Sequence, residues 1–267
     1  MKFDPSKAWN DATRLLSRNR DVVVVIAGVF FFLPYLAIML LAPELGAPFA
    51  SGAKPSETPE EAMAQLSALG ADFFVTMIVL GLIQAVGVLG LLRLLTNRER
   101  PTVGEALFSG LQNLLPYIAT QVLQGLLFVL ILSIPLALAL MSGVPALVTL
   151  AGGIVIVGAI FLFVRFSLIS PVIAIDQVRN PLAALQRSWA LTKGRAGSLL
   201  FFFVLLAIAT FVIFVVASVV FGLVFAIGGA EMLVIGSGIL GALINAMWVT
   251  MFMAVLAAVH RQLSAAE

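Results

Sequence analysis

Long uninterrupted runs of hydrophobic residues, each closed by charged or turn-forming residues, dominate the pattern of this chain. Each run approaches or exceeds the roughly 20 residues that an α-helix needs to cross a bilayer. We therefore predict about six transmembrane helices, at residues 22–42, 73–95, 114–140, 146–164, 199–227 and 232–259. The predicted fold class is all-α, a polytopic membrane helical bundle that forms a single integral membrane domain over residues 1–267.

Shorter segments before the first, third and fifth runs carry apolar residues at the spacing of an amphipathic helix. They predict three interfacial helices, near residues 4–17, 102–115 and 180–194. Asp4 and Asn180 are expected N-caps, each followed by a proline at the first helical position, and Gly194 is an expected stop. The chain thus divides into three units of interfacial helix plus transmembrane hairpin. Either the units are a true internal repeat, or each simply covers a loop between spans.

The segment 43–72 is the only sizeable connection on the side of the predicted spans opposite the termini. Thr58 to Glu61 has the pattern of a capping box with proline at the first helical position, and Gly70 follows a short amphipathic stretch. The pattern predicts a short helix near the outer interface. This helix would act as a lid or as a structural cover.

Composition narrows the class of protein further. Hydrophobic residues make up 62% of the chain and charged residues 10%, whereas a soluble domain is about half apolar and a quarter charged. A soluble fold of this size could not hide that much apolar surface, so lipid is the expected solvent. Cysteine is absent, which excludes disulfides and thiolate chemistry.

The basic residues give the predicted orientation. With six spans, every Lys and Arg except Lys54 falls on one side, while the other side carries mainly Glu and Asp. The positive-inside rule makes the basic side cytoplasmic, with both termini inside. The first run is too long for a signal-peptide core and no clear cleavage site follows it, so we interpret it as a retained anchor. We expect a bacterial inner (cytoplasmic) membrane protein with no nucleic-acid partner.

One stretch, residues 164–194, carries a specific motif. An Arg precedes an apolar segment with a Pro and an acidic residue, and a helix with the pattern A-L-x-x-S-x-x-L-T-x-G follows. These places are held by Arg165, Pro171, Asp176, Ala184, Leu185, Ser188, Leu191, Thr192 and Gly194. The stretch resembles the YciC-like group of bacterial six-span proteins, related to the membrane domain attached to some glycerophosphoryl diester phosphodiesterases. Asp176 stands where Glu is commoner in that group. The resemblance implies a role in membrane-lipid or envelope homeostasis.

Basic residues cluster around the third amphipathic helix. Together with one tryptophan they are the expected contacts to lipid headgroups: Arg165, Arg179, Arg187, Trp189, Lys193 and Arg195. Each basic group near an anionic leaflet contributes about 1 kcal/mol of attraction, so anionic phospholipids are the expected partners. The alternative is that these residues only set the topology, with Arg165 paired to Asp176. The following residues, 166–175, either continue a long tilted fourth span or break at Pro171 and lie along the interface.

Polar residues at membrane depth are few: Gln84, Gln121, Gln124 and Asn245. Because an unsatisfied amide in lipid costs several kcal/mol, we expect Gln84 and Asn245 to face the bundle interior and to bond to neighbouring helices. No ionisable residue lies in the middle of a span, which argues against an ion-coupled pump. Small residues spaced four apart in the last two spans suit tight helix packing, within one chain or in a homo-oligomer or complex with another membrane protein.

No catalytic motif is present in the sequence. The one histidine, His260, is expected to be a polar helix end, and no residues have the spacing of metal ligands. We therefore predict no catalytic residue, no metal and no cofactor. The leading hypothesis is a non-catalytic membrane protein that binds lipid or a partner in envelope or lipid homeostasis. The alternative is a small-solute or lipid transporter, which a cavity lined by Gln84, Gln124 and Asn245 would favour.

Overall fold

The computed structural model describes residues 3–41, 64, 70–96 and 102–265. Within these residues the chain forms helices and no strands, and six helical segments are long and apolar enough to cross a membrane. The predicted all-α polytopic fold is confirmed. The first span combines α2 (Arg20–Ala27), the π-helix η1 (Gly28–Phe32) and α3 (Leu33–Leu41). The other long helices are α6 (Ala71–Thr96), α8 (Leu114–Met141), α9 (Pro145–Phe166), α12 (Ala196–Ile227) and α13 (Ala230–Ser264).

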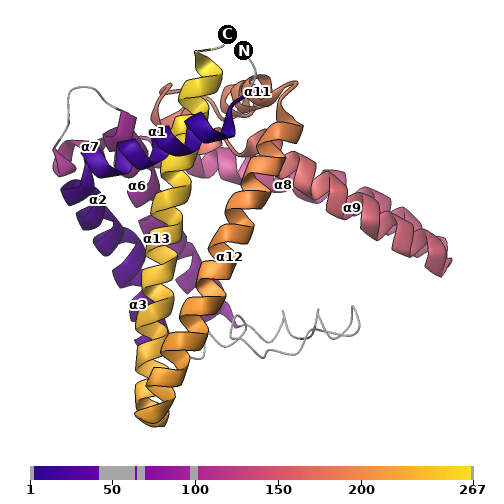
Figure 1. Ribbon diagram of the computed structural model, residues 1–267. Coiled ribbons are helices and arrows are strands. Elements are labelled where there is room, and N and C mark those ends of the chain that lie inside the picture. Colours follow the sequence, from indigo (N-terminus) through magenta and orange to yellow (C-terminus); the bar gives the residue numbers. More distant parts are fainter. Residues whose placement is uncertain (1–2, 42–63, 65–69, 97–101, 266–267) are drawn as a thin grey trace.

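Three short helices gather at one end of the molecule, together with the beginning of the described chain and the end of α13 (Figure 1). They are α1 (Pro5–Arg18), α7 (Val103–Gln112) and α11 (Pro181–Thr192). We call this region the interfacial end. The predicted caps are present, since Asp4 Oδ1 accepts hydrogen bonds from two backbone amides and so does Asn180 Oδ1. Gly194 has a φ of +75°, which suits glycine as the stop after α11.

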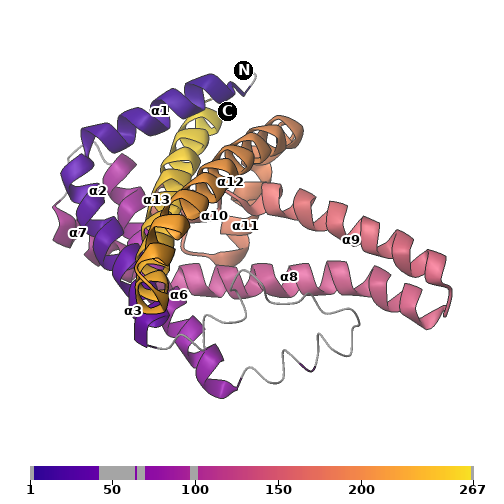
Figure 2. The ribbon, with the colours of Figure 1, turned by 60° about the horizontal axis from the view of Figure 1, so that its bottom comes forward.

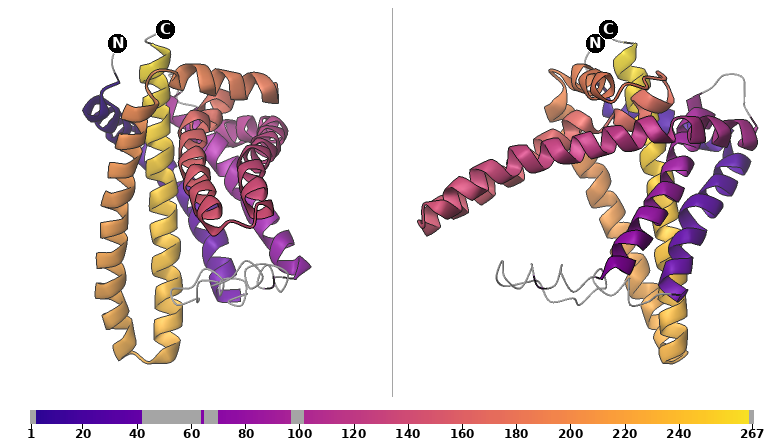
Figure 3. Two further views of the ribbon diagram at one scale, coloured as in Figure 1. Left: turned by 90° about the vertical axis from the view of Figure 1, so that its right-hand side faces the viewer. Right: turned by 180° about the vertical axis from the view of Figure 1, so that it is seen from behind.

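Three helical hairpins extend from the interfacial end. The first span pairs with α6, α8 with α9, and α12 with α13. The α8–α9 hairpin points away from the other two (Figure 2 and Figure 3). The α8–α9 hairpin therefore meets the other two at the interfacial end and diverges from them beyond it, while α3 stays packed against α13.

The buried core lies mainly at the interfacial end. Apart from Ile26 and Phe31 of the first span, its largest fully buried side chains come from the second half of α6, from α10 and α11 or their flanks, from the start of α12 and from the end of α13: Leu89, Leu91, Leu92, Leu168, Ile169, Ile173, Leu191, Leu199, Leu256 and Leu263. Along α8, by contrast, only Thr120 and Ala139 are buried. Because lipid is as apolar as these exposed side chains, the spread hairpins suit a bilayer and not water.

The fourth candidate span is long, Pro145–Ala174, but its helix is interrupted near the end. Helix α9 stops at Phe166, the chain turns at Ser167 and Leu168, and α10 (Ile169–Ala174) follows. The break therefore comes before Pro171, which sits in the first turn of α10, where its missing N–H has no intrahelical role. Residues Ile169 and Pro171 to Ala174 are buried. The segment is therefore part of the buried core.

A π-helical turn interrupts the first span just before Pro34. Proline lacks the N–H that would continue the helical ladder, and its ring displaces a carbonyl one turn earlier. Asn245 of α13 donates from Nδ2 to Phe31 O at 3.2 Å. The expected bond from Asn245 to a neighbouring helix is thus present, and it supplies a donor beside the irregular turn. Of the helix predicted between Thr58 and Gly70, only Ala64, which is helical, and Gly70 are among the described residues.

Candidate functional site

The motif residues of α11 fasten this helix to the end of α9. Ser188 Oγ donates to Arg165 O at 2.8 Å. Thr192 Oγ1 lies 3.0 Å from Ser188 O in its own helix and 3.4 Å from Arg165 O. Ser188, Leu191 and Thr192 are fully buried. The small polar side chains therefore satisfy a carbonyl that the end of α9 leaves without an intrahelical partner.

The Arg165 side chain lies against aromatic rings. Its guanidinium carbon is 4.6 Å from the centre of the Trp189 ring and 5.0 Å from that of Phe161. One terminal nitrogen approaches Trp189 O at 3.5 Å, which is long for a hydrogen bond. The buried Nε has no hydrogen-bond partner. Among the described residues no carboxylate pairs with Arg165. Cation–π contacts with Trp189 and Phe161 therefore stabilise its charge.

Asp176 lies in the turn before α11 and joins two other elements. Its Oδ2 accepts a hydrogen bond from His260 Nε2 of α13 at 3.1 Å and lies 3.5 Å from Arg187 Nε of α11. Burial opposes ionisation of the carboxyl, but the hydrogen bond from His260 and the nearby charges of His260 and Arg187 outweigh it, so the pKa of Asp176 is lowered. The expected Arg165–Asp176 ion pair is replaced by this arrangement, because Arg165 turns toward Trp189.

The contacts of His260 do not form a nucleophilic triad. Ser264 Oγ lies 3.5 Å from the same ring nitrogen, Nε2, that faces Asp176. A triad needs the carboxylate on one ring nitrogen and the nucleophile on the other. The cluster instead links the end of α13 to the α10–α11 turn.

The remaining basic residues of the predicted headgroup site surround α11. Arg179 and Lys193 are exposed, while Arg195 is partly buried. Lys193 directly follows Thr192 and is the C-cap residue of α11. The structure thus brings Arg165, Trp189 and Lys193 to one end of α9 and α11. Arg187 instead lies beside Asp176, and we call Asp176, His260 and Arg187 the Asp176 cluster.

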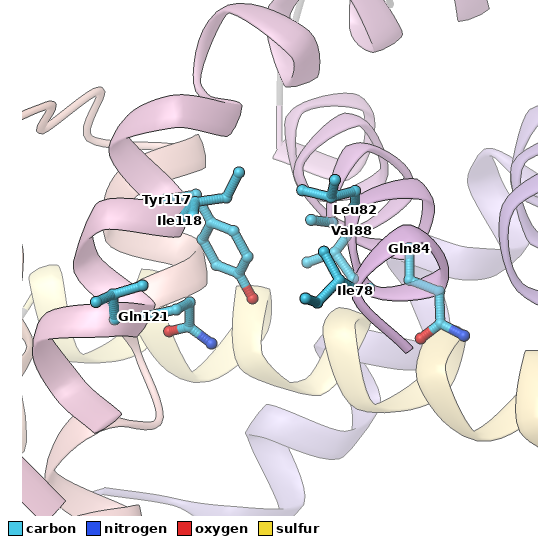
Figure 4. A pocket seen from close by; sticks show the side chains of 10 residues that line it. Ile78, Leu82, Gln84, Val88, Tyr117, Ile118 and Gln121 are labelled. Carbon is cyan, nitrogen blue, oxygen red and sulfur yellow. The ribbon is translucent and has the colours of Figure 1, made fainter. Parts of the chain in front are cut away.

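A groove of about 480 Å³ separates α6 from α8. Its walls are mainly apolar and include the α6 residues Ile78 and Leu82. In Figure 4, Tyr117 and Gln121 extend from α8 into the space facing α6, while the amide of Gln84 turns away from α8. Ile78 is 62% exposed, so the groove opens to the side of the bundle.

The four intramembrane amides do not share one cavity. Gln84 and Gln121 line the groove, whereas Gln124 is not among its lining residues and Asn245 bonds to the first span. The bond expected from Gln84 to a neighbouring helix is not formed with any described residue. The amide of Gln84 turns away from α8 (Figure 4), so α8 does not supply the partner.

Sequence reasoning missed the role of His260. It was expected to be a polar helix end, but only 3% of it is exposed and it bonds to Asp176, 84 residues earlier. No local pattern connects the two residues. A similar long-range bond runs from Asn113 Nδ2 at the start of α8 to Gln177 Oε1 at 3.3 Å.

Comparison with models of known protein families, with curated proteins and with solved structures finds no match for this chain. Within the described residues, no three His, Asp or Glu side chains converge as metal ligands. The fold itself defines the class, a multi-pass integral membrane protein built from helical hairpins.

Proposed function

We propose that this protein is a non-catalytic, lipid-binding membrane protein that takes part in membrane-lipid or envelope homeostasis. The single observation that carries the proposal is the state of Arg165. Its charge lies on aromatic rings, its buried Nε lacks a hydrogen bond, and no carboxylate of the described chain neutralises it. A phospholipid phosphate beside the guanidinium would supply the missing negative charge.

The surroundings of Arg165 support an anionic headgroup. Trp189 is 36% exposed, and an aromatic ring that is partly buried and partly exposed suits headgroup depth. Exposed Lys193 and Arg179 add positive charge near the same interface. Under this proposal the interfacial end faces the cytoplasm of a bacterium, as the basic side should. The resemblance of residues 164–194 to the YciC-like group is consistent with such a role.

Lipid selectivity tests the proposal. Purified protein would be reconstituted in nanodiscs containing equal amounts of phosphatidylglycerol and phosphatidylcholine, and retained lipid measured by native mass spectrometry. We expect phosphatidylglycerol to be retained preferentially by wild type, and the preference to fall at least threefold in Arg165→Gln and in Arg179→Gln/Lys193→Gln. Arg187 is left unchanged because it pairs with Asp176.

The matched control is Lys7→Gln/Arg14→Gln, which removes the same charge from exposed positions of α1. If this control variant lowers the preference for phosphatidylglycerol equally, the basic residues act only through their overall positive charge, which sets the topology. The proposed headgroup site would then be wrong. The same experiment counts the subunits, which tests the expected homo-oligomer.

Lipid transport is the second candidate function, and the groove between α6 and α8 favours it. The groove opens to the side of the bundle and contains the amide of Gln121. A transporter would move labelled lipid between the leaflets of sealed vesicles. Unchanged transbilayer exchange after reconstitution would reject this candidate and leave the binding function.

A further inference from the structure

The unpartnered amide in the groove points to a specific ligand. Gln121 is exposed on α8, and its side chain forms no hydrogen bond with any described residue. Bulk hydrocarbon offers an amide no partner. In Figure 4 the side chain extends into a groove whose other walls are mainly aliphatic. A fitting ligand therefore combines a long apolar part with a hydrogen-bond acceptor near one end.

The position of Gln121 along α8 indicates which part of a lipid its side chain would meet. Helix α8 starts at Leu114 at the interfacial end, and Gln121 lies about 10 Å further along the helix axis. Since α8 leaves that end at a large angle to α13 (Figure 3), Gln121 lies less than this distance from that end when measured along α13. That is the region where the ester carbonyls of a phospholipid meet its chains.

The shape of the groove also fits a chain. Gly81 and Ala85, one helical turn apart on α6, leave room between larger aliphatic side chains. A Cβ added to Gly81 would meet nothing within 4 Å, so the space beside it is empty. The volume of about 480 Å³ lies within the usual range for small-ligand sites.

We infer that the groove between α6 and α8 binds one acyl chain of a diacyl phospholipid from the leaflet at the interfacial end, with Gln121 donating a hydrogen bond to the ester carbonyl of that chain. The site recognises the chain and its ester and is independent of headgroup charge. It is separate from the headgroup site at Arg165 and does not depend on it.

Photolabelling tests the inference. The protein is reconstituted with phosphatidylcholine carrying a diazirine on one acyl chain, transferred to detergent, washed and irradiated, so that only retained lipid reacts. We expect labelled peptides to contain residues 78–88 and 117–122. Gly81→Leu, which fills the groove, should lower this labelling at least fivefold. The matched control Gly125→Leu, on α8 and also with open space at its Cβ, should stay within twofold of wild type.

Gln121→Leu tests the ester contact separately. Wild type should retain ester-linked phosphatidylcholine about threefold better than its ether-linked analogue, and Gln121→Leu should lose this difference. Labelling of Gly81→Leu within twofold of wild type would overturn the proposal that the groove binds an acyl chain. An equal ester preference in wild type and Gln121→Leu would overturn the proposed hydrogen bond from Gln121 to the ester. The Arg179→Gln/Lys193→Gln variant should keep full labelling, so failure of the headgroup site and failure of the groove are distinguishable.

Discussion

The α8–α9 hairpin and the interfacial end are both apolar, but their side chains have different surroundings. At the interfacial end, α6, α10, α11 and α13 bury their side chains in one another. Asp176 bonds to His260 of α13, and Ser188 of α11 donates to Arg165 O at the end of α9. The hairpin leaves most of its side chains exposed, including Leu138 at 64%. Both regions are strongly apolar, so burial is decided by what lies beside each helix and not by its hydrophobicity. Protein packing holds the first region in place, whereas lipid solvates the second.

The largest expected difference between the two regions is in the cost of a core truncation. Leu91→Ala removes a fully buried side chain at the interfacial end, and we expect a loss of about 2–4 kcal/mol in the free energy of unfolding. Leu138→Ala, on the exposed face of α8, should cost less than about 0.5 kcal/mol. Unfolding in mixed detergent micelles measures both. Equal losses would show that α8 is buried in the functional assembly.

The Asp176 cluster should give the next largest effect. Asp176→Asn removes the charge that faces His260 and Arg187, and we expect a loss of about 1.5–3 kcal/mol at pH 7. Because the folded state lowers the pKa of Asp176, its ionised form stabilises the fold above the ordinary Asp range. This contribution is lost as the pH falls below about 4.

Unfolding measured at pH 7 and again at acidic pH checks this prediction. The gap in stability between wild type and Asp176→Asn should close at acidic pH. The matched control, Asp72→Asn, changes an exposed carboxylate at the start of α6, far from the cluster. A gap that persists at acidic pH would mean that the charge of Asp176 is not what stabilises the fold.

Substituting glycine by alanine tests how closely neighbouring side chains approach the helices of each region. A Cβ on Gly87 of α6 would lie 2.5 Å from Phe30 Cβ and 2.9 Å from Phe31 Cε1, so Gly87→Ala should destabilise by about 1–3 kcal/mol. Gly152 of α9 has nothing within 4 Å, and Gly152→Ala should be neutral or slightly stabilising. The same unfolding assay tests the pair. A large loss for Gly152→Ala would reveal a partner on α9.

The smallest expected effect belongs to Asn245. Asn245→Leu removes the bond to Phe31 O, and interhelical bonds of this kind contribute about 0.6–1.7 kcal/mol. Thr210→Val is the control, since the Thr210 hydroxyl bonds to Leu206 O within its own helix. If both substitutions cost the same, the Asn245 bond does not tie α13 to the first span.

The sequence predicts the spans well because hydrophobic length is a local property. The structure has six helical segments long and apolar enough to cross a membrane, as predicted, and it has the predicted caps at Asp4 and Asn180. The predicted break at Pro171 is not confirmed, since the helix is interrupted at Ser167 and Leu168. Helices distant in the chain bury α10, and local sequence does not reveal such packing. The cluster at Asp176 was missed for the same reason, since His260 lies far away in sequence.

The bond between Asn245 and Phe31 has a consequence for synthesis of the protein. The two residues are 214 positions apart, and ribosomes add about 5–20 residues per second. The first span therefore waits about 10–40 s after its own synthesis before its partner exists. During that interval the irregular turn before Pro34 lacks the donor that Asn245 later supplies. A chain truncated before α13 would keep a first span that inserts but cannot complete its pairing, which makes the last helix the closing step of assembly.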